Sequence, residues 1–142
     1  MNVKIKLLNE NAVVPEYQTD GAVAVDLVAT SETINVEKGY ISYGTGIAIE
    51  IPEGHEAQIR PRSSIRDKDL FLCNSPGTID FDFRGEVFVT FKPTRPMKAR
   101  KYQIGERIAQ LVICPIVKVK FTVVDELTET KRGSGGFGST NK

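Results

Sequence analysis

Glu86-Val87-Phe88-Val89-Thr90-Phe91-Lys92 decides the fold class, because Val87, Val89 and Phe91 fall at every second position of this stretch. A period of two places side chains on alternate faces of a strand, with one face turned to a core. The same period recurs in three other short runs, at residues 3–7, 47–51 and 119–123. Each run is bounded by Gly, Pro, Asn or Asp, which predicts an all-β sandwich or barrel.

The size and charge of the chain narrow its class. It has 142 residues, of which 40% are hydrophobic and 26% charged, as expected for one globular domain. The net charge of +1 gives no reason to expect a nucleic-acid or membrane partner. No signal-peptide core follows Met1, so we expect a cytoplasmic protein, or one inside a host cell if it is viral. Cys73 and Cys114 are predicted to be reduced, buried thiols.

Two segments interrupt the strand pattern. Ser63 to Leu70 is the one helix candidate, with Ser63 as N-cap and Ile65 and Leu70 facing inward. The turn signals Pro-Gly and Arg-Gly predict a hairpin over residues 78–83. This hairpin would place Asp80 and Asp82 on one face, either as paired carboxylates that orient a water or as a solvated turn.

The end of the chain loses its apolar residues. We predict a folded domain over residues 1–128 and a mobile, glycine-rich arm over 129–142. Gly- and Ser-rich ends are usually untethered. Arg132 and Phe137, however, would allow the arm to hold phosphate oxygens and stack on a flat ring.

Three further segments each allow a functional or a plain structural interpretation. Arg62 lies in an Arg-Pro-Arg-Ser-Ser stretch that fits an anion site or a capped helix. Arg107 and Gln110 fit a polar site or the outer face of a strand. Asp26 stands alone in an apolar run, so it must be paired or exposed.

Taken in chain order, five segments resemble the five motifs of the trimeric dUTPase family, over nearly the whole chain. They are the apolar run around Asp26, the Arg-Pro-Arg-Ser-Ser stretch at 60–64, the hairpin residues 76–86, Gly-Glu-Arg-Ile-Ala-Gln-Leu at 105–111 and the arm residues 132–140. The resemblance implies a jelly-roll-like β-barrel with one short helix. It also implies a homotrimer with shared active sites at its subunit boundaries. The implied reaction is hydrolysis of dUTP to dUMP and pyrophosphate with Mg²⁺.

The resemblance assigns roles by position. Asp80 matches the catalytic aspartate that deprotonates a water for attack on the α-phosphorus. The implied uracil and sugar contacts are Asn74, Gly77, Thr78, Ile79 and Phe83. The implied phosphate contacts on the folded domain are Arg62, Ser63, Ser64 and Gln110. On the arm, the implied contacts are Arg132 and Ser139 to the γ-phosphate, Phe137 to uracil, and Gly138. Arg107 would brace a neighbouring motif, and Asp26 would hold the metal through water.

Two departures from the family pattern bear on the site. Phe83 replaces a Tyr, which keeps the ring and loses a hydroxyl. Ser64 replaces a Gly in the phosphate turn, where glycine would allow more backbone freedom. Two other functions share this fold: a dCTP deaminase, which needs an acid that the stretch between Val87 and Lys92 lacks, and a nucleotide-gated protein binder.

Overall fold

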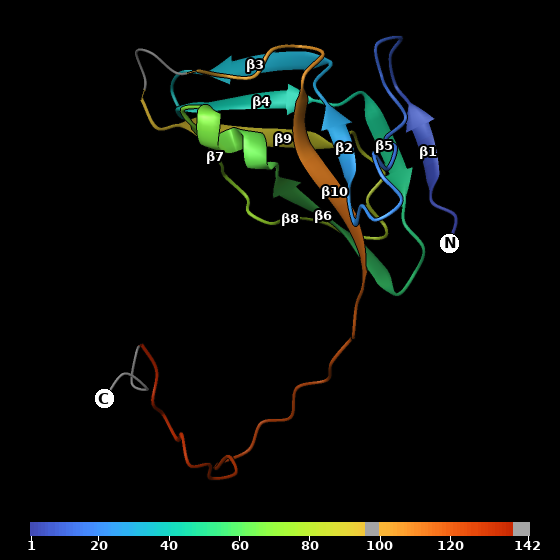
Figure 1. Ribbon diagram of the computed structural model, residues 1–142. Coiled ribbons are helices and arrows are strands. Elements are labelled where there is room, and N and C mark those ends of the chain that lie inside the picture. The colour runs from blue at the N-terminus through green and yellow to red at the C-terminus, as the bar shows by residue number, and fades with distance from the viewer. Residues whose placement is uncertain (96–99, 138–142) are drawn as a thin grey trace.

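The computed structural model describes residues 1–95 and 100–137, and the strands in these residues carry almost all of the regular structure (Figure 1). The elements are β1 (Lys4–Leu7), β2 (Val25–Val28), β3 (Ser31–Asn35), β4 (Tyr40–Gly44), β5 (Ile47–Glu50), β6 (His55–Pro61), the 3₁₀ helix η1 (Ser63–Asp67), β7 (Leu70–Leu72), β8 (Gly77–Ile79), β9 (Phe88–Pro93) and β10 (Arg107–Pro115). The prediction of an all-β fold with one short helix is confirmed.

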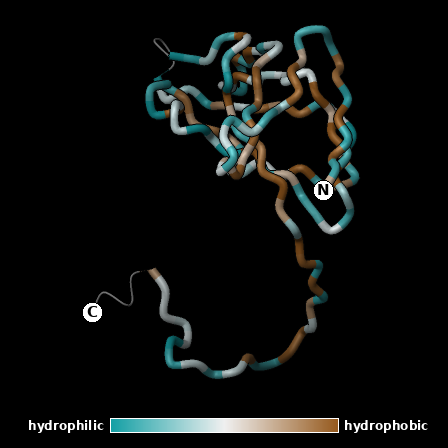
Figure 2. The backbone as a smooth tube through the Cα atoms, turned by 45° about the vertical axis from the view of Figure 1, so that its right-hand side comes forward, coloured by the Kyte–Doolittle hydropathy of each residue, from teal (hydrophilic) through white to brown (hydrophobic). Residues whose placement is uncertain are grey.

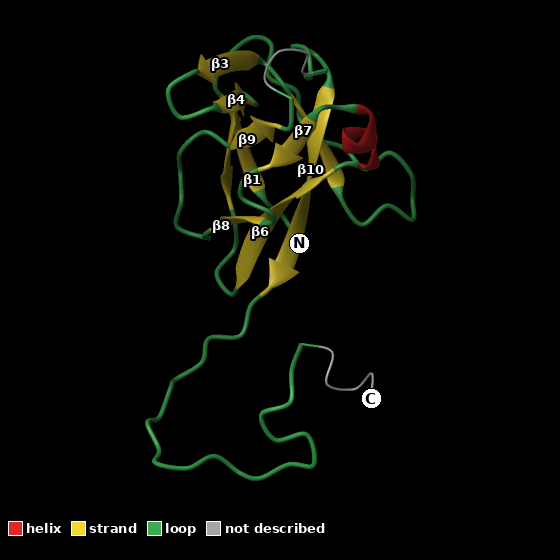
Figure 3. Cartoon of the chain, turned by 90° about the vertical axis from the view of Figure 1, so that its left-hand side faces the viewer, coloured by secondary structure: helices red, strands yellow, loops and turns green. Residues whose placement is uncertain are grey.

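The strands form three antiparallel sheets (Figure 3). One sheet has the order β2-β10-β6-β8, a second the order β3-β4-β9-β7, and β1 pairs with β5 in a two-stranded ribbon. Side chains from all three sheets meet in one hydrophobic core, the arrangement of a jelly-roll-type sandwich. The described strands are grouped as separate sheets around this core rather than as one closed ladder.

Strand β9 shows why the alternation predicted the fold. Val87, Val89 and Phe91 are each at most 1% exposed, whereas Phe88 faces outward and is 49% exposed. Phe91 packs against Tyr102, with ring centroids 5.4 Å apart, and the Tyr43 hydroxyl donates a 2.9 Å hydrogen bond to the Tyr102 carbonyl. Burial of these rings stabilises the centre of the sandwich.

Two local predictions are corrected. The helix candidate is a 3₁₀ helix of five residues, without a side-chain cap from Ser63, and Leu70 belongs instead to β7. The predicted hairpin has one strand, β8, which pairs with β6. Its expected second strand is a loop, because the chain crosses there to the other sheet, where β9 begins at Phe88.

The chain after β10 leaves the sandwich (Figures 1 and 2). The alternating run at residues 119–123 predicted a strand, and this prediction is wrong: the structure assigns no strand there. Its apolar side chains lie in solvent, with Val119, Phe121 and Val123 exposed by 65%, 90% and 97%. Within the described ranges, no helix is long and apolar enough to cross a membrane. The two cysteines are free as expected, but Cys73 is exposed and Cys114 half-buried, so neither is buried as predicted.

Candidate active site

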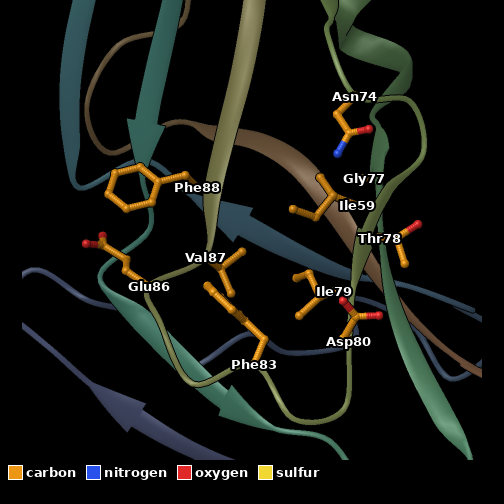
Figure 4. A pocket seen from close by; sticks show the side chains of 10 residues that line it. All are labelled: Ile59, Asn74, Gly77, Thr78, Ile79, Asp80, Phe83, Glu86, Val87 and Phe88. Carbon is orange, nitrogen blue, oxygen red and sulfur yellow. The ribbon is translucent and has the colours of Figure 1, made fainter.

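A cavity lies beside β8, at the edge of its sheet (Figure 4). Its volume is about 300 Å³, the lower end of the range for small-molecule sites. The residues that line this β8 cavity are Ile59, Asn74, Gly77, Thr78, Ile79, Asp80, Phe83, Glu86, Val87 and Phe88. The structure therefore brings together all six residues that were predicted to contact the base, the sugar and the attacking water.

Strand β8 is fixed by its neighbour β6. Gly77 lies opposite Ile59 and Thr78 opposite Gln58. A β-carbon at Gly77 would stand 3.2 Å from the Ile59 β-carbon, so glycine permits this close approach. Because β8 is the last strand of its sheet, the outer edge of its backbone has no strand partner among the described residues, and all three β8 residues line the cavity.

The turn after β8 carries Asp80 and Phe83. The Phe83 amide donates to the Asp80 carbonyl at 3.1 Å. Arg84 Nη1 donates to the carbonyls of Phe81 and Phe83 at 2.7 and 2.9 Å. The Phe83 ring lies over Gly85, where an added β-carbon would be 2.5 Å from Phe83 Cζ. The turn thus presents an exposed carboxylate and a ring to one cavity (Figure 4).

A second group of predicted residues, the arginine cluster, consists of Asp26, Arg62, Arg107 and Gln110. Strand β10 brings them together because it pairs with both β2 and β6, so that Gln110 lies opposite Asp26 on one side. Arg62 Nε donates to Asp26 Oδ1 at 2.7 Å, and Arg107 Nε lies 3.7 Å from Asp26 Oδ2. Asp26 is therefore paired, as its apolar surroundings required.

The cluster extends to the turns that flank β6 and β10. Gln110 Nε2 donates to the Pro61 carbonyl at 2.8 Å, which fixes the chain just before Arg62. A β-bulge falls between Arg107 and Ala109, a feature that often redirects a side chain next to a site. Backbone hydrogen bonding from Gln103, with help from the Lys68 ammonium, lowers the pKa of Glu106, which keeps a negative charge at the start of β10.

The two predicted serines differ in where they lie. Both belong to η1, directly after Arg62. Ser63 is exposed, whereas Ser64 is half-buried and its hydroxyl lies 3.4 Å from the Tyr102 hydroxyl. The side chain of Ser64 thus faces the protein, which leaves its backbone as the part of this residue that can contact a phosphate.

The arm residues join neither group. Arg132 Nε donates to the Gly135 carbonyl at 2.8 Å within the arm, and Phe137 is fully exposed. Gly138 and Ser139 lie outside the described residues. Within the described part of the chain, no hydrogen bond or ion pair links the β8 cavity, the arginine cluster and the arm to one another.

Sequence reasoning missed four residues of the cavity: Ile59, Glu86, Val87 and Phe88. The alternation identified β9 but gave no signal that Phe88, where β9 begins, and the two residues before it would line a cavity beside β8, which belongs to the other sheet. Glu86 holds the neighbouring β4–β5 turn, since its Oε1 accepts a 2.8 Å hydrogen bond from the Gly46 amide.

Comparison with known proteins matches this architecture. The family model described as dUTPase matches residues 10–141. The protein named deoxyuridine 5'-triphosphate nucleotidohydrolase from Nautilia profundicola is 45% identical over 143 residues, covering 100% of both chains. The protein of that name from Hydrogenobaculum sp. is 46% identical over 144 residues, covering 99% of this chain and 98% of its own.

Two solved structures share the fold. A mutant dUTPase of Staphylococcus bacteriophage 80alpha with dUpNHpp has a TM-score of 0.79 at 23% identity, covering 98% of each chain. A mutant dUTPase of phage phi11 of S. aureus, described with a structural Mg(II) ion, has a TM-score of 0.76 at 22% identity, covering 91% of this chain and 100% of its own.

Proposed function

The chain belongs to the dUTPase family and is a dUTP diphosphatase, and we propose which of its residues bind dUTP and which activate the attacking water. The reaction converts dUTP and water to dUMP and pyrophosphate, which keeps uracil out of DNA and supplies dUMP for thymidylate synthesis. The observation that carries the proposal is the β8 cavity, in which a free backbone edge, an amide, a ring and a carboxylate converge.

The base is read by the edge of β8. An unpaired strand edge offers N–H donors and C=O acceptors at fixed spacing, and uracil presents the complementary groups on its own edge. Asn74 adds a side-chain amide that can donate and accept. Because Gly77 and Ile79 are buried and paired with β6, strand β8 cannot shift away from a bound base. The methyl group of thymine would therefore meet the cavity wall.

The sugar packs on Phe83. This ring forms a wall of the cavity and is 45% exposed, so a deoxyribose can cover it. A 2′-hydroxyl on that surface would lose its hydration without gaining a partner, because Phe83 offers no hydrogen-bonding group. The wall therefore favours a deoxyribonucleotide over a ribonucleotide.

Asp80 is the residue proposed to activate the attacking water. This residue is exposed at the end of β8, where its carboxylate can accept a proton from a water held against the α-phosphorus. Phosphoryl transfer depends mainly on positioning and on neutralising the phosphate oxygens. Arg62 and the backbone of Ser63 and Ser64 supply the phosphate contacts, and Gln110 Oε1 remains available to accept from the water.

Mg²⁺ is the cofactor we propose. No group of three or more His, Cys, Asp or Glu side chains is arranged to hold a metal in residues 1–95 and 100–137. This donor set suits an ion held mainly by substrate phosphates and water, which is how Mg²⁺ usually binds at nucleotide sites. Asp26 would accept hydrogen bonds from the ion's water shell. The ion, when bound, offsets negative charge on the phosphate oxygens.

We propose that the active sites are completed between the subunits of a homotrimer. The β8 cavity and the arginine cluster are joined to opposite edges of β6, through β8 and β10 respectively. Phe137 is fully exposed, and the chain after β10 leaves the body (Figure 1). This placement supports a site in which one nucleotide takes the three groups from different copies of the chain.

We also propose that the protein acts in the cytoplasm, or in a host-cell interior if the chain is viral, because its substrate is a free nucleotide.

The exposed run at residues 117–124 is the segment proposed to hold the copies together. A second cavity, of about 240 Å³, lies beside β1 and is lined mainly by apolar side chains, among them Val3, Val25, Leu111 and Ile113. Strand β1 pairs only with β5 among the described strands. An alternating apolar segment from a neighbouring copy could extend the ribbon at β1 and bury its side chains in this groove.

Replacing both Phe121 and Val123 with Ser is expected to shift the protein from trimer to smaller species. Both side chains are at least 90% exposed in the single chain, so the loss would report contacts between copies. Size-exclusion chromatography with light scattering measures the mass. Lys120→Ser is the matched control, since Lys120 directly precedes Phe121 and falls on the other face of the alternating run. An unchanged trimer in the double variant would contradict the proposed interface.

A side-by-side assay of pyrophosphate release from dUTP, dTTP, dCTP and UTP tests the proposed selectivity. We expect dUTP to be cleaved with a kcat/KM at least about 100-fold above that of the other three, the scale set by clashes and unpaired polar groups in a fitted site. Comparable cleavage of UTP would show that Phe83 does not exclude the 2′-hydroxyl. Ammonia release from dCTP would instead identify a deaminase.

A further inference from the structure

Asp26 is enclosed by positive charge rather than open to solvent. Its side chain is 15% exposed, and both carboxylate oxygens face a guanidinium: Oδ1 accepts from Arg62 Nε at 2.7 Å, and Oδ2 lies 3.7 Å from Arg107 Nε. The 2.7 Å contact has the length of a charge-assisted hydrogen bond. Asp26 is held in place by β2, where it lies opposite Gln110 of β10.

The orientation of Arg62 follows from these contacts. Besides Nε, its Nη1 donates to the Arg107 carbonyl at 3.2 Å. A guanidinium has five N–H donors, so two are used within the protein and three remain. In residues 1–95 and 100–137, both N–H groups of Nη2 lack a protein acceptor. These Nη2 groups are therefore free to donate to a ligand.

The cluster also has an excess of positive charge. Arg62 and Arg107 contribute two positive charges and Asp26 one negative charge, which leaves a net +1 at the start of η1. The Arg62 side chain is 28% exposed, so the free donors remain accessible. Gln110 secures the Pro61 carbonyl, which limits movement of the backbone that carries Arg62. This combination favours an anion with several oxygen acceptors.

We infer that Asp26 is a positioning residue that orients Arg62 toward the triphosphate, with Arg107 facing its second carboxylate oxygen, and that it does so whether or not the metal is bound. This role is distinct from the predicted contact with Mg²⁺ through water, which would vanish when the metal is removed. It rests on the dUTP diphosphatase function proposed above. The carboxylate contributes to binding by keeping Arg62 in one orientation, so less conformational freedom is lost when the phosphate arrives.

The decisive test measures binding without metal. Calorimetric titration of α,β-imido-dUTP into the trimer in EDTA should show Asp26→Asn binding about 10-fold more weakly than wild type, the scale of a lost charge-assisted hydrogen bond. The same loss should persist when Mg²⁺ is added. Equal binding of wild type and variant in EDTA, with a loss only in Mg²⁺, would overturn the inference and leave Asp26 as a metal contact.

A double-variant cycle provides the second readout. If Asp26 acts through Arg62, then Asp26→Asn should cause little further loss of binding in an Arg62→Ala background. Full additivity of the two losses would contradict the inference. Should Asp26→Asn fail to fold, Asp26→Glu serves instead: it keeps the charge but shifts the carboxylate from its 2.7 Å contact with Arg62 Nε, and should also weaken binding in EDTA. Unchanged binding of Asp26→Glu in EDTA would contradict the inference.

Glu32→Gln is the matched control. Glu32 is also half-buried in an ion pair, with its Oε1 2.6 Å from Lys101 Nζ and its side chain 21% exposed, but it lies in the other sheet. Its substitution should leave binding in EDTA unchanged. Hydrolysis of dUTP by wild type, measured on the same preparation, separates the two possible failures: an inactive wild type refutes the proposed function, whereas an active wild type with unaltered Asp26→Asn binding in EDTA refutes only the inference.

Discussion

Asp80→Asn is expected to fold normally and to lower kcat for dUTP by at least about 100-fold, the usual scale for losing a general base. Asp80 is exposed at the end of β8, so the substitution leaves no buried charge behind. Asparagine keeps the shape and the hydrogen-bonding capacity of the side chain but cannot take the proton from water. Single-turnover release of pyrophosphate separates this loss from any change in nucleotide binding.

Asp82→Asn is the natural control for this experiment. Asp82 lies in the same turn and is also exposed, but it is not among the residues that line the β8 cavity. It should keep wild-type turnover, with the same thermal unfolding temperature as Asp80→Asn. An Asp80→Asn enzyme with unimpaired turnover would show that another group accepts the proton.

Deleting the chain from Arg132 onward is expected to leave the trimer intact and to reduce kcat/KM by at least about 100-fold. The described part of this segment makes hydrogen bonds only within the arm, as between Arg132 and Gly135, so its removal should not affect stability. Loss of activity is expected because a stacked ring and a charged phosphate contact each contribute about 1–3 kcal/mol.

Two measurements interpret the truncation. Light scattering should give the same mass as the full chain, since the proposed subunit contact at residues 117–124 is retained. Phe137→Ala should reproduce part of the loss and Phe137→Tyr very little, because stacking needs only the ring. Full activity in the truncated protein would refute the idea that the arm closes over the nucleotide.

The fold could be predicted from sequence wherever a strand has one face on the core of its own chain. Val87, Val89 and Phe91 meet that condition, and their period alone identified β9. The run at residues 119–123 has the same period but no buried face within the chain. A period of two predicts a strand with one covered face, but it does not require that the same chain supply the neighbouring strand. No described strand pairs with this run, and the strand prediction failed there for that reason.

The individual site residues could be predicted from the sequence, but which of them contact one another could not. The family motifs identified Asp80, Phe83 and Gln110, and the apolar run around Asp26 required a partner for its charge. Which partner depended on the register of β2 against β10 and on the path of the chain after β6. These are contacts between distant segments, which no local pattern in the sequence specifies.

The contact between Phe83 and Gly85 carries a consequence for how this enzyme can evolve. The ring occupies the room that any side chain at position 85 would need, since an added β-carbon would lie 2.5 Å from its edge. A side chain at position 85 would require the exposed Phe83 ring to turn away, and the ring would then leave its place in the lining of the β8 cavity. Positions 83 and 85 are therefore coupled, and the effects of substitutions at the two are expected to depend on each other rather than to add.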